Sequence, residues 1–224
     1  VGDPEIPDHI TLNGLLIPMR KGLDQYVCLR PNILFPGVVS PLVNPNVDLV
    51  VVRENTEGEY ASVGGNFKPD TEDEVAIQTA IFTRKGTERI IRYAFEVAIS
   101  RSKTPKLTSV TKSNAQRYGM VFWEKVFQEV ASEYPNVETE SLLVDAACMD
   151  LIRRPSEFDV IVGSNLFGDI LSDIAAVITG SMGLAPSANI NPEKQFPSLF
   201  EPVHGSAPDI VGKNISNPIA AVLS

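Results

Sequence analysis

Two aspartates, Asp169 and Asp173, lie four residues apart shortly after an apolar, β-branched run. Residues four apart share one face of a helix, and two like charges there repel each other by about 0.2–0.5 kcal/mol. A divalent cation would relieve that repulsion, because Mg²⁺ and Mn²⁺ take hard oxygen ligands. The spacing equally allows a structural interpretation, with Asp169 near the positive end of the helix and Asp173 in solvent. Both interpretations stay open on spacing alone.

A third carboxylate, Asp145, stands where another predicted strand gives way to a predicted helix. It is either a further metal ligand or a helix cap, for which Asp is among the best residues and contributes about 1 kcal/mol. Taken alone, the position favours the cap. Sequence spacing does not bring Asp145 to Asp169.

Three arginines, Arg20, Arg30 and Arg53, form a second group of candidates. A guanidinium group binds a carboxylate through two parallel hydrogen bonds, so three that converge would suit a substrate with two carboxylates. Taken singly, each position is more typical of an exposed surface arginine. Convergence of the three side chains on one place would favour the substrate-binding interpretation.

Lys112 and Tyr60 are candidates for proton transfer. Lys112 follows the predicted strand 106–111, and Tyr60 comes seven residues after Arg53, so both can lie at strand ends where α/β sites form. A buried Lys beside other cations can accept a proton near neutral pH, and a Tyr hydroxyl can deliver one. A lone Lys or Tyr is nevertheless more often a surface or core residue.

The chain offers an unusual candidate for a cofactor site. No G-x-G-x-x-G follows a predicted strand, so an ordinary Rossmann dinucleotide site is not supported. The stretch 201–210 instead contains small residues that allow close backbone approach, together with His204 and Asp209. An acid such as Asp209 can bind ribose hydroxyls and would repel a 2′-phosphate. His204 could equally be a turn histidine.

The elements that must position these residues alternate between short β-branched runs and longer segments of helical period, which predicts an α/β fold. The predicted helices, 85–102 and 120–134, each place apolar residues on one broad face. Beyond Gly183, six prolines break up any long element, which indicates a loop-rich, ligand-facing region or a linker. The predicted strands are 48–53, 75–83, 106–111, 137–144 and 159–163.

The composition excludes several classes of protein. A net charge of −9 argues against a general nucleic-acid binder, since that affinity depends on Lys and Arg that neutralise phosphates. No apolar run approaches the ~18 residues needed to span a bilayer, so we expect no membrane partner. Cys28 and Cys148 lie among apolar residues, which predicts buried free thiols in a reducing compartment and hence a cytoplasmic protein.

Several stretches, in order along the chain, resemble the β-decarboxylating hydroxyacid dehydrogenases, the family of isocitrate, isopropylmalate and homoisocitrate dehydrogenases. The resemblance runs nearly end to end and is strongest to the members that act on tartrate and D-malate. It implies the two-lobed α/β fold of that family, here truncated at both termini, because family members extend beyond both ends. The stretches that carry the resemblance are 24–31, 52–60, 111–114, 163–173 and 201–209.

The resemblance implies NAD-dependent oxidative decarboxylation of a 2-hydroxy dicarboxylic acid, such as D-malate to pyruvate and CO₂, or the oxidation of tartrate. Mg²⁺ or Mn²⁺ would be held by Asp169 and Asp173 of one subunit and Asp145 of the partner subunit. A monovalent cation is compatible with the family pattern. A homodimer would be needed for catalysis, because its active sites are shared between subunits.

The resemblance also implies roles for the remaining candidates. Arg20, Arg30 and Arg53 would bind the substrate carboxylates. Lys112, reaching over from the partner subunit, would take the hydroxyl proton, and Tyr60 would protonate the enol left after loss of CO₂. The residues implied to line the NAD site are Glu201 at the nicotinamide end, His204, Gly205, Ser206 and Ala207 along it, and Asp209 and Asn217 at the adenosine.

Two lobes are expected: a nucleotide-side lobe of residues 1–25 and 180–224, and a central lobe of residues 26–179 for dimerisation, metal and substrate. In stretch 11–14 the chain lacks the Trp of tartrate-oxidising members. Because that position shapes the pocket for the variable group of the substrate, 3-isopropylmalate is an alternative substrate. A non-catalytic assembly or regulatory subunit of the same fold is a further alternative, which the joint presence of the candidate acids, Lys112 and Tyr60 disfavours.

Overall fold

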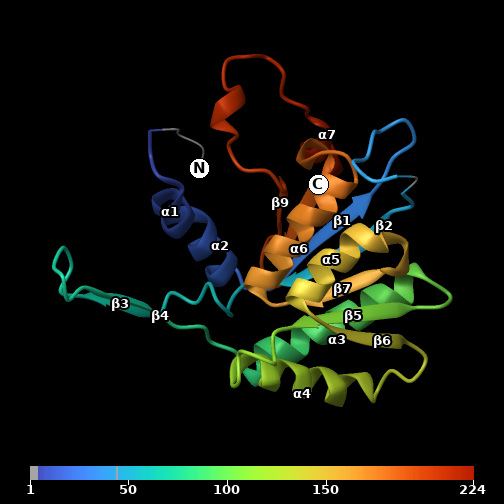
Figure 1. The fold of residues 1–224 in the computed structure, drawn as a ribbon, viewed down its shortest axis with the longest axis horizontal. Coiled ribbons are helices and arrows are strands. Elements are labelled where there is room, and N and C mark those ends of the chain that lie inside the picture. The colour runs from blue at the N-terminus through green and yellow to red at the C-terminus, as the bar shows by residue number, and fades with distance from the viewer. Residues whose placement is uncertain (1–4, 44) are drawn as a thin grey trace.

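A seven-stranded mixed sheet forms the centre of the computed structural model, which describes residues 5–43 and 45–224 (Figure 1). Residues 1–4, part of the predicted nucleotide-side lobe, lie outside the described residues. The strand order is β6-β5-β7-β2-β1-β8-β9. The strands are β1 (Val27–Ile33), β2 (Asp48–Glu54), β5 (Lys106–Thr111), β6 (Glu138–Leu143), β7 (Val160–Gly163), β8 (Pro186–Ile190) and β9 (Leu199–Pro202).

Four neighbouring strands, β6, β5, β7 and β2, run parallel. The sequence predicted all four to within one residue at each end, because each is a short run rich in β-branched residues. In β2 every residue after Asp48 is buried, as expected for a central strand covered on both faces. Since the four strands are parallel, their carboxyl ends lie at one edge of the sheet, where α/β proteins place their sites.

Helices cover both faces of this sheet. α3 (Arg84–Arg101) and α4 (Gly119–Ala131) pack on one face, and α5 (Val144–Arg153) and α6 (Asn165–Ile178) on the other (Figure 1). The hydroxyl of Thr83 caps α3 by accepting a hydrogen bond from the Gly86 N–H at 2.9 Å. The helices predicted at 85–102 and 120–134 are therefore confirmed as α3 and α4.

The hydrophobic core lies between the helices and the sheet. Phe95 of α3 and Phe127 of α4 are fully buried, with ring centroids 5.8 Å apart. Trp123 is 1% exposed and donates from Nε1 to the hydroxyl of Ser109 in β5 at 3.1 Å. Full burial of a large apolar side chain stabilises a fold by about 1.5–3 kcal/mol relative to exposure. The apolar stripes of the two predicted helices thus belong to the core, as expected, except for Val121, which is 48% exposed.

The other three strands of the sheet were not predicted. β1 lies antiparallel between β2 and β8, and β9 pairs antiparallel with β8. The region after Gly183 therefore contains two strands besides its loops, together with α7 (Ile219–Leu223). Because β8 and β9 continue the sheet of the central strands, a boundary between lobes at residue 180 crosses this sheet. The division into lobes stays a prediction.

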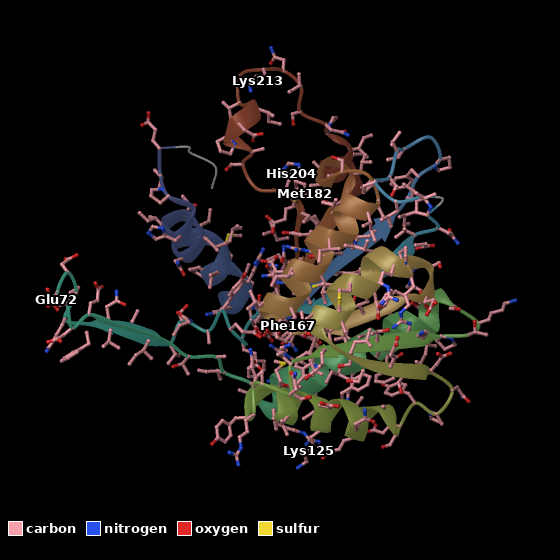
Figure 2. The ribbon with its side chains drawn as sticks, viewed as in Figure 1. Glu72, Lys125, Phe167, Met182, His204 and Lys213 are labelled. Carbon is pink, nitrogen blue, oxygen red and sulfur yellow. The ribbon has the colours of Figure 1, made fainter. Side chains whose placement is uncertain are left out.

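One predicted strand, 75–83, is wrong in length and place. Only β4 (Val75–Gln78) forms, and it pairs with β3 (Gly64–Phe67) in a separate hairpin that projects from the body of the protein (Figure 1). Figure 2 shows Glu72 at the tip of this hairpin. All residues of both strands are exposed, so the apolar side chains there do not pack on the core formed by the described residues.

The segment before β1 is helical and carries a π-helical turn. It consists of α1 (Asp8–Thr11), the π turn (Leu12–Leu16) and α2 (Ile17–Gly22). π turns widen a helix locally and are frequent at functional sites. Here the turn precedes Arg20, one of the candidate residues.

The two cysteines are free, as expected, but their environments differ. Cys28 in β1 is fully buried, whereas Cys148 in α5 is only partly buried, so the burial prediction holds for Cys28 alone. Within the described ranges, no helix has both the length and the apolar character that crossing a membrane requires.

Candidate active site

Asp169 is the centre of a polar cluster. Its Oδ1 accepts hydrogen bonds from Nη1 of Arg53 and, at 2.9 Å, from Nη1 of Arg30, and its Oδ2 accepts one from the Tyr60 hydroxyl at 3.0 Å. Arg53 and Arg30 are 1% and 5% exposed, so their charges are largely removed from water. Charge-assisted hydrogen bonds of this kind are stronger than neutral ones. Four predicted site residues therefore meet in one place.

Neighbouring elements at the carboxyl edge of the parallel strands position this cluster. Arg53 lies near the end of β2, and Asp169 lies in the second turn of α6, which follows β7, the strand paired with β2. Ser164 caps α6 with its hydroxyl. Gly168 allows α6 to approach β2 closely, because a Cβ at this position would lie 2.6 Å from the Cβ of Arg53.

The third predicted arginine, Arg20 of α2, faces Glu201 of β9. Nη2 of Arg20 donates to Oε1 of Glu201 at 3.1 Å, and the same oxygen accepts from Nδ2 of Asn189 at 2.8 Å. Arg20 is 7% exposed, and its Nε is buried without an acceptor among the described residues. A charged donor in that state suits an anionic ligand, since a buried charge needs compensation.

These side chains line one cavity of about 390 Å³, a size typical of small-molecule sites. Three guanidiniums face two carboxylates there, which leaves a positive excess that attracts anions. Another part of the wall is apolar and consists of Leu12, Leu16 and Ile17. The charged and phenolic residues of the lining are Arg20, Arg30, Arg53, Tyr60, Asp169 and Glu201.

Burial and neighbouring charges set the protonation states in the cluster. Burial opposes ionisation of Asp169, but the charges of Arg53 and Arg30 outweigh it and hold the pKa below its usual 3.8. Asp173, one turn further along α6, has its pKa raised by burial and by the negative charge of Asp169. Burial and the nearby Asp169 also raise the pKa of Tyr60 above its usual 10.0, so the phenol is protonated at neutral pH.

Lys112 and Asp145 form a second, separate pair. Lys112 follows β5, Asp145 lies in the first turn of α5, and Nζ of Lys112 donates to Oδ1 of Asp145 at 2.5 Å. The N-cap of α5 is Leu143, so the interpretation of Asp145 as a helix cap is wrong. Within the described part of one chain, neither residue is hydrogen-bonded or ion-paired to the cluster around Asp169. Their contribution to the site of another subunit stays a prediction.

A second cavity, of about 630 Å³, adjoins the first. His204 and Ser206 line both cavities, and Figure 2 shows His204 near Met182, which lines the second. Small residues and one acid on its walls suit a nucleotide. Of the predicted cofactor residues, this cavity gathers His204, Ser206, Ala207, Asp209 and Asn217, whereas Glu201 and Gly205 line the first cavity.

Asp169 and Asp173 fit a divalent cation by their chemistry. Carboxylate oxygens are the ligands that Mg²⁺ and Mn²⁺ prefer, and Oδ2 of Asp169 keeps acceptor capacity beyond its bond to Tyr60. A cation would also relieve the repulsion from Asp169 that, after burial, raises the pKa of Asp173. Across residues 5–43 and 45–224 of a single chain, no three acidic, His or Cys side chains group closely enough to hold a metal.

Two polar residues that hold the arginines were missed from the sequence. Oδ1 of Asn165 accepts from Nε and Nη2 of Arg53 at 3.1 and 2.8 Å, and the hydroxyl of Ser172 accepts from Nη1 of Arg30 at 2.6 Å. A signal for both was present, because residues 165, 169 and 172 share one face of a helix.

Known proteins match this chain along nearly its whole length. Residues 1–224 match the family described as isocitrate/isopropylmalate dehydrogenase. The chain is 54% identical over 226 residues to D-malate dehydrogenase (decarboxylating) of Escherichia coli strain K12, an alignment that covers 99% of this chain and 62% of that protein. It is 53% identical over 224 residues to tartrate dehydrogenase/decarboxylase of Pseudomonas putida, covering 98% of this chain and 61% of that protein.

A solved structure shares the fold. Isocitrate dehydrogenase from Methylococcus capsulatus matches with a TM-score of 0.86 at 44% identity, over 93% of this chain and 60% of that chain. The chain therefore spans about three fifths of the length of the relatives it matches.

Proposed function

The chain belongs to the isocitrate/isopropylmalate dehydrogenase family, as the resemblance of its motifs implied, and we propose that the full-length protein oxidises a 2-hydroxy dicarboxylic acid with NAD and releases CO₂. We propose D-malate, converted to pyruvate, and tartrate as substrates, since relatives that carry these names are 54% and 53% identical to this chain. The observation that carries the proposal is the convergence of three guanidiniums with Tyr60 and Asp169 on one cavity.

The arginines would bind and orient the substrate. The cavity walls carry three guanidiniums and two carboxylates, and this excess of positive charge attracts an anionic substrate such as a diacid. Charge-assisted hydrogen bonds from Arg20, Arg30 and Arg53 would fix the orientation of both carboxylates. The substrate would then lie beside the cofactor cavity, because the two cavities share His204 and Ser206 in their linings.

Asp169 and Asp173 would hold Mg²⁺ or Mn²⁺ together with Asp145 of the partner subunit. When bound, the cation supplies Lewis-acid polarisation of the substrate oxygen, and NAD supplies the hydride acceptor. His204 and Ser206, which lie between the two cavities, would hold the nicotinamide beside the substrate.

Two side chains would move protons. Lys112 of the partner subunit would take the proton of the substrate hydroxyl as the hydride leaves its carbon. Tyr60, whose raised pKa keeps the phenol protonated, would deliver a proton to the carbon that has lost its carboxylate. The hydrogen bond from Tyr60 to Asp169 holds the hydroxyl at the cavity wall for this step.

A homodimer would complete the site, and the outer face of α5 and α6 is the surface we propose for it. An apolar cavity of about 540 Å³ lies on this face with Asp173 in its lining. Covering exposed apolar side chains stabilises association. A second copy docked here would bring its α5, and with it Asp145, toward Asp173. The large apolar residues left 42% to 55% exposed on this face are Met149, Ile152, Ile170 and Val177.

We also propose a cytoplasmic location and the division into two lobes. Free cysteines are typical of proteins in reducing compartments. The division at residue 180 is supported by the second cavity, since all of its lining residues lie between Ser181 and Asn217.

A second candidate substrate is 3-isopropylmalate. The observation that favours it is the apolar wall of the first cavity, where Leu12, Leu16 and Ile17 would contact an alkyl group. D-malate stays the first candidate, because it is the substrate named for a relative with 54% identity.

The test is a substrate panel on the full-length protein. NADH absorbance and CO₂ release would be followed with D-malate, tartrate and 3-isopropylmalate, each with Mn²⁺ and after removal of metal by a chelator. We expect metal-dependent turnover, fastest with D-malate or tartrate and slower with NADP than with NAD. Faster turnover of 3-isopropylmalate would favour the second candidate, and no turnover of any diacid would defeat the proposal.

Two single substitutions test whether Asp173 binds the metal. Asp173→Asn should raise the Mn²⁺ concentration needed for half-maximal activity. Asp48→Asn is the matched control, because Asp48 begins the strand that carries Arg53 but lies at its far end, paired with Arg101. The control should leave the Mn²⁺ requirement unchanged.

A further inference from the structure

Asn165 is hydrogen-bonded to both Arg53 and Glu57, two residues of the segment that leads from β2 to Tyr60. It is 2% exposed and begins α6. Its Oδ1 accepts from Nε and Nη2 of Arg53, and its Nδ2 donates to the backbone carbonyl of Glu57 at 3.0 Å. One buried amide therefore holds the arginine at the end of β2 and the loop that leads to Tyr60.

We propose that Asn165 is a positioning residue for the reaction: it orients the guanidinium of Arg53 so that Nη1 alone points to Asp169 and the substrate cavity. The inference rests on the proposed function, because it assigns a role within that same site. Two of the three nitrogens of Arg53 are occupied by Asn165, and the remaining one contacts Asp169. Rotation of the guanidinium plane would break both bonds to the amide.

The chemistry of an amide suits this role better than that of other side chains. A carboxylate at the same place would accept the same bonds but would neutralise Arg53, whose charge the substrate needs. An apolar side chain would leave two N–H groups of a buried cation without acceptors, which is a costly state. The amide accepts without adding charge, so the positive charge stays available to the cavity.

Tight packing keeps Arg53 and Tyr60 in fixed relation around the amide. A Cβ on Gly58, which has a φ of 73°, would lie 3.3 Å from the Cβ of Asn165. The guanidinium carbon of Arg53 lies 5.4 Å from the centre of the Tyr60 ring, within the range of a cation–π contact. A shift of Arg53 would therefore displace both the anion contact and the support of the phenol.

Replacement of Asn165 by alanine should act selectively. We expect Asn165→Ala in the full-length protein to raise the KM for the diacid and lower kcat/KM by roughly ten- to a hundredfold, the range for hydrogen bonds to a charged group. The KM for NAD should change little, because no cofactor-cavity residue contacts Asn165 among its described hydrogen bonds.

The matched control is Asn191→Ala. Asn191 is also 2% exposed and also makes three hydrogen bonds, to Asp24, Gln195 and Phe196. It holds a loop outside the cavity, so the same deletion there should lower thermal stability without a selective rise in the KM for the diacid.

A double-mutant cycle with Arg53→Lys tests whether Asn165 acts through Arg53. Lysine cannot present the paired N–H groups that Asn165 binds. The effect of Asn165→Ala on kcat/KM should therefore nearly vanish in the Arg53→Lys background, whereas the effect of Asn191→Ala should stay the same in both backgrounds. An equal loss from Asn165→Ala in both backgrounds would overturn the proposal.

A crystal structure of the Asn165→Ala variant decides the question without relying on turnover. The proposal requires the Arg53 guanidinium to rotate or leave Asp169. A guanidinium that keeps its contact with Asp169 would overturn it, even if the enzyme is active. If the unaltered protein turns over no diacid, the proposed function fails, and the crystal structure still reports on the positioning.

Discussion

Replacing Gly168 by alanine tests whether the close approach of α6 to β2 sets the position of Arg53. A Cβ on Gly168 would lie 2.6 Å from Cβ and 2.7 Å from Cγ of Arg53. Carbon atoms in contact normally lie about 3.5–4.0 Å apart. The helix or the arginine must therefore move by roughly 1 Å to accommodate the added methyl group.

Two effects of opposite sign decide the stability of this variant. Alanine is better than glycine in a helix by about 1 kcal/mol, whereas overpacking costs about 1–3 kcal/mol. Because the neighbour is the buried stem of Arg53 rather than a flexible tip, we expect overpacking to outweigh the helix gain, with a net loss of up to about 2 kcal/mol. A displacement of about 1 Å near reacting groups can lower the rate by about a hundredfold.

The measurements are urea unfolding and the kinetics of the full-length protein. Gly14→Ala is the matched control for stability, because Gly14 is also helical but a Cβ there would meet nothing within 4 Å. The control should be stabilised by about 0.5–1 kcal/mol. If Gly168→Ala were stabilised like the control and kept its KM for the diacid, the argument from close approach would be refuted.

Four further outcomes are expected. Lys112→Ala should lower kcat by about 10²–10⁴-fold while leaving substrate binding nearly unchanged, as measured by steady-state kinetics and calorimetry; an unchanged kcat would remove Lys112 from the reaction. Asp209→Asn should improve the use of NADP relative to NAD, since a negative charge no longer faces a 2′-phosphate, and an unchanged cofactor ratio would contradict that role. Trp123→Phe should cost about 1–3 kcal/mol in urea unfolding, because it leaves the buried Ser109 hydroxyl without the indole donor; Phe122→Leu, on the same helix but less buried, should cost less. Because the folded-state pKa of Asp169 lies below the usual 3.8, its contribution to stability is present above about pH 4 and is lost as the pH falls through the folded-state value; Asp169→Asn should flatten that part of the acid unfolding curve, and an unchanged curve would show that the ion pairs of Asp169 do not stabilise the fold.

Helices and strands could be predicted where a single local pattern in the sequence is strong. β2, β5 and β7 are short runs rich in β-branched residues, and the apolar stripes of α3 and α4 follow the helical period. β1 escaped prediction because Arg30, Pro31 and Asn32 interrupt its apolar pattern, and its pairing with β2 and β8 depends on distant parts of the chain. Apolar and polar residues alternate in the run 75–83 as in a strand. This period does not indicate which other strand the run pairs with, or whether a core covers it.

For the candidate site, the sequence likewise indicated which residues take part but not which of them lie together. Residue types at strand ends pointed to Arg53, Lys112, Asp145 and the acids of α6, and the family resemblance supplied their roles. Which of them pair within one chain depends on strand order: β5 beside β6 brings Lys112 to Asp145, and β2 beside β7 brings Arg53 to the start of α6. Sequence spacing contains no information on that order. Asn165 lies on the same helix face as Asp169, but this signal was missed because an Asn near a helix start is typical of ordinary capping.

The contacts that build the cavity have a consequence for biosynthesis, because they join distant parts of the chain. The ion pair between Arg20 and Glu201 spans 181 residues, and the hydrogen bond between Tyr60 and Asp169 spans 109. Loop closure over such distances delays folding. A nascent chain that has left the ribosome only as far as β6 already contains the three arginines but not the acids that will neutralise them. Until α6 and β9 emerge, the pocket lacks the acids that neutralise these cations, so it cannot be completed before residue 201 has left the ribosome.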